Sequence, residues 1–139
     1  MKYRFLNHTA DAQFQAYGNS LEEAFQNAAE AMASLMWSVK KIKPRIKRKI
    51  NARGRDEEQL LLNFLEEILY LLELEDFLFH SVEDIGIKKE KTGYYLGASF
   101  LGDKFSDEYE IFGMIKAVTY NDMIIKKNDH YMIQVVVDI

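Results

Sequence analysis

Carboxylates near the two ends of the 139-residue sequence are the side chains best suited to chemistry. Asp11 precedes an alternating apolar segment, and Asp138 is followed by Ile139, whose terminal carboxylate would add a third negative group. Together, three carboxylates would suit a hard cation such as calcium, magnesium or manganese, because these ions prefer oxygen ligands. They could not all stay ionised at close range without a cation or a basic residue between them, and Lys116 is a candidate neighbour.

A plainer interpretation of the same residues stays open. Asp11 could cap a turn, Asp138 could be the solvated end of a strand, and Lys116 could be an exposed strand residue. Isolated surface charges usually have no specific role, so the residues taken alone favour this second interpretation.

Other chemistries find little support in the residue types. The sequence has no cysteine, which excludes disulfides, thiolate metal sites and cysteine nucleophiles. It also lacks a glycine-rich nucleotide loop, an H-E-x-x-H zinc motif and a G-x-S-x-G nucleophile motif. His8, His80 and His130 stand far apart, so the motifs predict no catalytic residue.

Charge and hydropathy restrict the class of protein further. No apolar run reaches the roughly 18 residues that span a bilayer, and the N-terminus lacks a signal-peptide pattern, so we expect a cytoplasmic protein with no membrane contact. The net charge is -4, but lysines and arginines crowd residues 40–55. This stretch could bind a phosphate backbone or an acidic partner; it is also typical of a charged edge strand, the interpretation we favour.

Two helices are predicted early in the chain. Ser20 and Glu23 form a capping box at the start of an amphipathic helix that continues to about Trp37. Asp56 caps a second helix, with Gln59 at its third position. The second helix is apolar around most of its girth, which predicts either a central place in the core or contacts on both sides of the helix.

Strands are predicted mainly in the later part. Alternation predicts strands over residues 12–17, 94–100 and 131–137, with a short, marginal strand over 46–52. A phase change near Glu83 predicts a bulge, and residues 103–110 predict an exposed acidic loop. Residues 114–120 and 123–126 predict two strands joined by a tight turn at residues 121–122.

This order of elements predicts the fold class. The whole chain, residues 1–139, should form one domain of α+β class, in which two helices pack on one face of a mainly antiparallel sheet in two layers.

A series of short blocks extends along nearly the whole chain. In order, these blocks are His8-Thr9-Ala10-Asp11, Ser20-Leu21-Glu22-Glu23-Ala24-Phe25, residues 63–71, Leu78-Phe79, Ile115-Lys116-Ala117-Val118-Thr119-Tyr120 and Val137-Asp138-Ile139. Their types and order resemble the archease family, whose members activate the RNA-splicing ligase that joins 3′-phosphate to 5′-hydroxyl RNA ends. The Lys-Ala-Val-Thr-Tyr block and the terminal Asp-Ile are the most specific parts.

The resemblance implies an archease-like fold and a site. It implies that Asp11 and Asp138 bind a divalent ion, with Ile139 contributing a backbone or terminal oxygen. Lys116 would belong to the same partner-activating cluster. His8 would either join the cluster or fix the turn as a structural histidine.

The implied function is accessory, not enzymatic. The protein would promote guanylylation of the ligase by GTP and its multiple turnover, in tRNA splicing and RNA repair, with at most weak or indirect contact with tRNA. A chaperone-like role toward tRNA-modifying enzymes is a variant of the same class. Two other classes stay open: a small metal-dependent phosphoester hydrolase, and an RNA-binding module that uses residues 40–55.

Three positions depart from the family pattern. Asn121 stands where the family usually has a histidine, a further histidine is replaced around Tyr109, and the turn over residues 73–76 is altered. Any role of those histidines is therefore in doubt in this chain.

Overall fold

The computed structural model describes residues 1–6 and 11–139 of the chain. In chain order, the elements are β1 (Tyr3–Leu6), β2 (Ala12–Gly18), α1 (Leu21–Ala33), the 3-10 helix η1 (Val39–Lys41), β3 (Ile46–Gly54), α2 (Glu57–Glu75), β4 (Phe77–Glu90), β5 (Gly93–Lys104), β6 (Ala117–Lys127) and β7 (Tyr131–Asp138). Among the helices described, none is long and apolar enough to cross a membrane.

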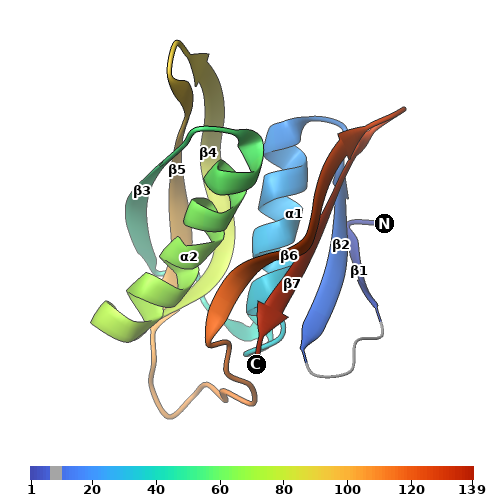
Figure 1. Ribbon diagram of the computed structural model, residues 1–139. Helices are drawn as coiled ribbons and strands as arrows, with labels where there is room; N and C mark the ends of the chain where they lie inside the picture. Colours follow the sequence, from blue (N-terminus) through green and yellow to red (C-terminus); the bar gives the residue numbers. More distant parts are fainter. Residues whose placement is uncertain (7–10) are drawn as a thin grey trace.

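The strands form two antiparallel sheets. The four-stranded sheet has the order β1-β2-β7-β6, and the three-stranded sheet has the order β3-β5-β4. Figure 1 shows α1 and α2 between the two sheets. The α+β class and the antiparallel pairing are confirmed; the difference is that two sheets, rather than one, cover the helices.

Helix α1 is capped at its start and is hydrogen-bonded to both sheets. Its Ser20 cap accepts a hydrogen bond from the Glu23 amide at 3.1 Å, and the Glu23 carboxylate accepts one from the Asn19 amide at 2.7 Å. The neighbouring amides Gln26 and Asn27 then bind one sheet each. Gln26 donates to the Val82 carbonyl in β4 at 3.2 Å, and Asn27 donates to the Tyr17 carbonyl in β2 at 2.6 Å.

A chain of phenylalanine rings forms the centre of the core. Phe64 of α2 lies 5.7 Å, between ring centroids, from both Phe25 of α1 and Phe100 of β5. Phe79 of β4 packs edge-on against Phe100 at 5.1 Å. All four rings are buried, so this cluster joins both helices to the three-stranded sheet.

Strand β6 corrects one prediction. The tight turn at residues 121–122 is wrong, because β6 runs without interruption from Ala117 to Lys127. Asp122 has a φ of 51° and lies in a register shift between Thr119 and Ile124. The Asn121 amide donates to the Thr119 hydroxyl at 3.2 Å, and Gln134 donates to the Asp122 carbonyl at 2.9 Å, so local hydrogen bonds stabilise a bulge instead of a turn.

The bulge predicted near Glu83, in β4, is confirmed. The register with β5 shifts between Glu83 and Gly86, and Asp84 has a φ of 55°. Strand β3 lies at an edge of its sheet, as the basic stretch indicates, although its nine residues exceed the short strand expected.

Residues 103–110 largely confirm the exposed loop expected, since residues 104–108 and Glu110 are exposed, but two residues of the segment are buried. Asp103 is the penultimate residue of β5, and both Asp103 and Tyr109 are buried. The Tyr109 hydroxyl donates to Asp103 Oδ2 at 2.6 Å, and Arg45 Nη1 donates to the same oxygen at 3.0 Å. These partners offset the cost of burying a carboxylate. The acidic composition of the segment predicts exposure and gives no sign that Asp103 is buried.

Candidate functional site

The register of the four-stranded sheet brings Asp11 and Asp138 to the same end of neighbouring strands. Ala12 pairs with Val137 across β2 and β7, so Asp11, one residue before β2, stands beside Asp138, the last residue of β7. Both aspartates are half-buried. Two residues 127 positions apart in the numbering therefore meet because their strands are antiparallel neighbours.

Strand alternation indicates the face of the sheet to which each aspartate position belongs. Gln15 of β2 donates to Gln134 of β7 at 2.8 Å, so these two side chains lie on one face. Asp11 comes four residues before Gln15, and Asp138 comes four residues after Gln134. Because side chains alternate along a strand with a period of two, Asp138 lies on the glutamine face, which is the face away from the helices. Asp11, the residue before β2, stands at the position where the same alternation would place it on that face.

Lys116 joins this end through its backbone. Its amide donates to the Asp138 carbonyl at 2.8 Å, and the next residue, Ala117, pairs with Asp138 at the start of β6. The Lys116 side chain is exposed and borders a groove of about 600 Å³ beside α2, together with Tyr70 and Glu73. The lysine thus extends the aspartate end toward α2.

Ile139 and His8 complete the predicted site. Ile139 follows Asp138 directly and is exposed. His8 lies outside the described residues, so its predicted place in the cluster stays a prediction.

The donor chemistry at this end partly fits a divalent ion. The two aspartates, together with an oxygen of Ile139, would supply hard oxygen ligands. Within residues 1–6 and 11–139, however, no group of three or more His, Cys, Asp or Glu side chains could hold a metal ion. A metal at this end would therefore need the oxygen of Ile139, water or ligands beyond the described residues.

Tyr109, one of the departures from the family pattern, is a structural residue. Its hydroxyl donates to Asp103 and accepts a hydrogen bond from the Lys43 amide at 3.2 Å, which fastens the loop after β5 to the segment before β3. Burial and the bond to Asp103 raise the pKa of Tyr109, whereas the Tyr109 hydrogen bond, with help from the Lys104 amide and Arg45, lowers the pKa of Asp103.

Most cations before and within β3 have acidic partners, which supports the edge-strand interpretation. Arg45 contacts Glu108 at 2.8 Å, and this bond raises the pKa of Arg45 and lowers that of Glu108. Lys47 contacts Glu83 at 3.4 Å. Further pairs are Lys43–Glu108, Arg48–Glu75 and Arg53–Glu90.

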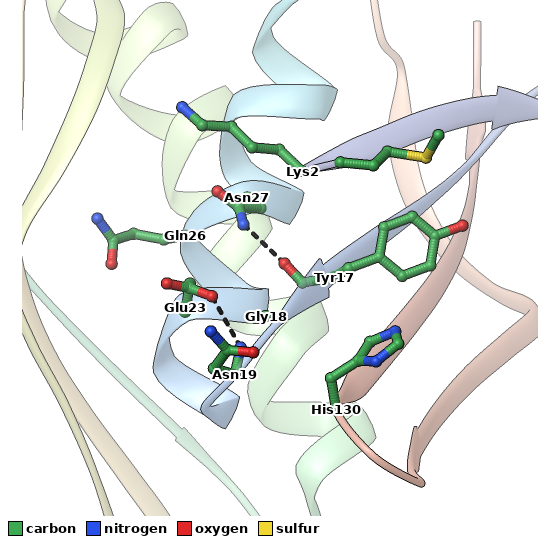
Figure 2. A pocket seen from close by; sticks show the side chains of 9 residues that line it. Lys2, Tyr17, Gly18, Asn19, Glu23, Gln26, Asn27 and His130 are labelled. Carbon is green, nitrogen blue, oxygen red and sulfur yellow. Dashed lines mark hydrogen bonds between the residues drawn. The ribbon is translucent and has the colours of Figure 1, made fainter.

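A pocket of about 740 Å³ lies at the opposite end of the four-stranded sheet, where β2 ends and β7 begins. Figure 2 shows Asn27 of α1 bound to the Tyr17 carbonyl, with His130 on the far side of the Tyr17 strand. The Tyr17 and His130 rings meet edge-on at 5.9 Å. Asn27 and Glu23 already form hydrogen bonds to backbone groups here. We therefore interpret the polar side chains of this pocket mainly as structural residues that connect α1 to β2.

Sequence reasoning missed this pocket and the groove beside α2. His130 stands alone in sequence, and its contact with Tyr17 depends on the pairing of β2 with β7. The groove does have a signal in the sequence, because Tyr70, one of its lining residues, interrupts the polar side of α2 and is exposed.

Comparisons with known proteins agree with this architecture. The model of the Archease protein family (MTH1598/TM1083) matches residues 3–139. The chain is 42% identical to the protein archease of Methanosarcina barkeri, covering 99% of this chain and 96% of that protein. It is 40% identical to the protein archease of Pyrobaculum neutrophilum, covering 99% and 95%.

A solved structure has the same fold. The solution structure of Methanobacterium thermoautotrophicum protein 1598 matches with a TM-score of 0.85 and 28% identity, covering 99% of each chain. The relatives and the family model each span nearly the full length, and on these grounds the chain belongs to the archease family.

Proposed function

We propose that this protein is an accessory factor of an RNA-splicing ligase. It docks on the ligase with the end that carries Asp11, Asp138 and Lys116, promotes guanylylation of the ligase by GTP, and so allows multiple turnover. The observation that carries the proposal is the register of β2 with β7, which brings the positions of Asp11 and Asp138 to the same end of neighbouring strands, in a chain of the archease family.

A docking role suits the surroundings of this end. Neither the pocket of Figure 2 nor the groove beside α2 includes Asp11 or Asp138. A hydrolase would need an enclosed cavity with a base to activate water, and these aspartates line neither hollow. Two exposed apolar side chains lie near Lys116: Tyr70 lines the same groove, and Met114 comes two residues earlier in the chain. Exposed side chains of this kind suit contact with a protein partner.

The proposed site acts through a divalent ion, calcium, magnesium or manganese. Asp11 and Asp138 would hold the ion with an oxygen of Ile139, and a bound ion would supply charge stabilisation and geometry for phosphoryl transfer in the partner. Lys116 would balance the carboxylates and contact the partner. His8 could add a further contact at the same end.

Multiple-turnover ligation by the cognate ligase, with and without this protein, tests the proposal. The informative variant is Asp138→Asn, which keeps the size of the side chain and removes its charge. Asp129→Asn is the matched control, because Asp129 is an exposed residue in the turn at the other end of β7. We expect stimulation by the wild type and by the control, and loss of most stimulation with Asp138→Asn.

Two results would contradict the proposal. If a cognate ligase turns over equally well without this protein, the accessory role is wrong. If Asp138→Asn stimulates like the wild type, the aspartate end is not the acting surface. Titration calorimetry with Ca²⁺ and Mn²⁺ separately tests the ion, because binding should weaken with Asp138→Asn and not with Asp129→Asn.

A further inference from the structure

The outer face of the three-stranded sheet is polar and lies away from both helices. In Figure 1 the two helices lie on the same side of β3, β5 and β4. The buried residues Ile50, Leu96 and Phe100 point to that side, so their strand neighbours point outward. The register gives three outward rows across the strands: Lys49–Ser99–Glu83, Asn51–Gly97–Gly86 and Arg53–Tyr95–Lys88.

Cations predominate in these rows and beside them. Lys47 pairs with Glu83, and Arg53 pairs with Glu90 at 2.6 Å; both pairs reach from β3 across β5 to β4. Lys49 and Lys88 are exposed and form no ion pair with any residue that the structure describes. The face therefore carries uncompensated positive charge on a chain whose net charge is -4.

Two glycines form the floor of the middle row, and packing explains neither of them. A Cβ added at Gly86 would meet nothing within 4 Å, and one at Gly97 would meet only Tyr95 and Asn51 at ordinary distances of 3.5–3.9 Å. The other five glycines differ, since a Cβ there would overlap backbone atoms. These are Gly18, Gly54, Gly93, Gly102 and Gly113.

Paired glycines inside strands therefore need another reason. Glycine weakens a strand and often marks a bulge or a place where a ligand or another backbone approaches closely. The bulge between Glu83 and Gly86 accounts for the first reason on β4, but it does not extend to Gly97 on β5. Gly86 and Gly97 are direct register partners, so the middle row has no side chain of its own on β4 and β5, and we call this glycine row the furrow.

Tyr95 forms one wall of this furrow and is held in place on two sides. The Arg53 guanidinium lies 4.7 Å from the centroid of the Tyr95 ring, and the Tyr95 hydroxyl donates to Asn51. Lys49 lies on the other side of the glycine row, and Lys88 lies beside Tyr95. A stacked arginine and tyrosine next to a floor without side chains is a surface on which a nucleobase can stack.

We propose that this furrow binds single-stranded RNA. Lys49 and Lys88, which have no acidic partner within the described part of the chain, contact the phosphates. Arg53 and Tyr95 offer the stacking surface, and the glycine floor lets the strand lie close to the sheet. Charge complementarity and the glycine pair carry this inference, which does not depend on the ligase or on the aspartate end. The stretch formed by residues 40–55 contributes through β3 only, since β4 and β5 supply the rest of the surface.

Fluorescence anisotropy with a labelled oligouridylate of about 12 nucleotides tests the proposal. Two phosphate contacts on a single strand predict a roughly sevenfold loss of affinity between about 50 and 200 mM salt. Lys49→Glu should weaken binding strongly, whereas Lys126→Glu, the same change at an exposed position on the other sheet, should not. Absence of binding at low salt, or equal effects of the two variants, would overturn the proposal.

Gly86→Val separates a furrow from a merely positive surface. The side chain has room, so the melting temperature should stay the same or rise, while the added atoms fill the floor and binding falls at least tenfold. Unchanged RNA binding by a folded Gly86→Val variant would overturn the proposal. Binding of polyglutamate with the affinity of the RNA would also overturn it, because the face would then recognise an acidic protein segment as readily.

Discussion

The outer faces of the two sheets differ in how they hold their strands together. On the four-stranded sheet, a line of hydrogen bonds without an ion pair crosses all four strands. Arg4 donates to Gln15 at 3.0 Å, Gln15 donates to Gln134 at 2.8 Å, and Gln134 donates to the Asp122 carbonyl at 2.9 Å. On the three-stranded sheet, the ion pairs Lys47–Glu83 and Arg53–Glu90 make the corresponding connections.

This difference separates two surfaces that can act independently. The amide line carries little charge, so the negative groups of its sheet stand out at one end, at Asp11 and Asp138. The ion pairs of the other sheet leave Lys49 and Lys88 uncompensated across a flat face. One protein of net charge -4 thus presents an acidic end and a basic face on different sheets, and the buried helices between them keep the two in fixed relation.

Removal of the ring at the centre of the core should affect both sheets at once. Phe64→Ala deletes a fully buried ring that contacts Phe25 and Phe100, and we expect a loss of about 3–5 kcal/mol in the free energy of unfolding. Urea denaturation measures the loss, and Phe5→Ala, at a ring that is 48% exposed, is the milder control. Hydrogen exchange should rise in both sheets; a rise in one sheet alone would contradict a shared core.

The two amides of α1 should loosen one sheet each. Asn27→Ala removes the bond to β2 and Gln26→Ala removes the bond to β4, each at a cost of about 1 kcal/mol. Hydrogen exchange should rise around Tyr17 in the first variant and around Val82 in the second. Each variant is the control for the other, and an identical exchange pattern in both would show that α1 does not hold the sheets separately.

Local signals in the sequence predicted much of this architecture. The caps at Ser20 and Asp56 depend on residues three apart, and both form the expected hydrogen bonds. The bulge near Glu83 follows from a phase change inside one strand. The apolar girth of α2 predicted cover on more than one side, but it did not reveal that the strands divide into two sheets.

Features that depend on distant partners could not be predicted in this way. An Asn-Asp pair at residues 121–122 is typical of a turn, but Gln134 from the next strand accommodates Asp122 in a bulge. Asp103 is buried because Tyr109 and Arg45 reach it. For the candidate site, the family resemblance implied a shared role for Asp11 and Asp138, but the pairing of β2 with β7, which brings them to one end of the sheet, is a long-range feature that no local pattern shows.

Asp103, in β5 of the three-stranded sheet, should make the free energy of unfolding depend on pH. Its pKa in the folded state lies below the ordinary 3.8, so the unfolded state takes up a proton first as the pH falls. The contribution is complete above the ordinary pKa and is lost as the pH falls through the folded pKa. Asp103→Asn should lower stability at neutral pH and flatten the curve below about pH 4.

Urea unfolding between about pH 2.5 and 7 measures this dependence. Asp107→Asn is the control, because Asp107 is exposed in the same loop. If the two variants follow the same curve, the hydrogen bond from Tyr109 does not stabilise the ionised form of Asp103.

The smallest expected loss in the free energy of unfolding, that of Glu90→Gln, distinguishes the two outer faces most directly. Glu90→Gln removes one ion pair between side chains that are 68% and 44% exposed, and we expect a loss below about 0.5 kcal/mol that disappears by about 1 M salt. Gln15→Ala removes bonds to Arg4, Tyr17 and Gln134, and should cost about 1 kcal/mol. Because two of these three bonds join uncharged groups, most of this loss should persist at high salt.

Denaturation at low and high salt measures both losses. If the loss caused by Glu90→Gln persists at high salt, the Arg53–Glu90 contact stabilises the sheet as a hydrogen bond and not through an attraction between charges that salt screens.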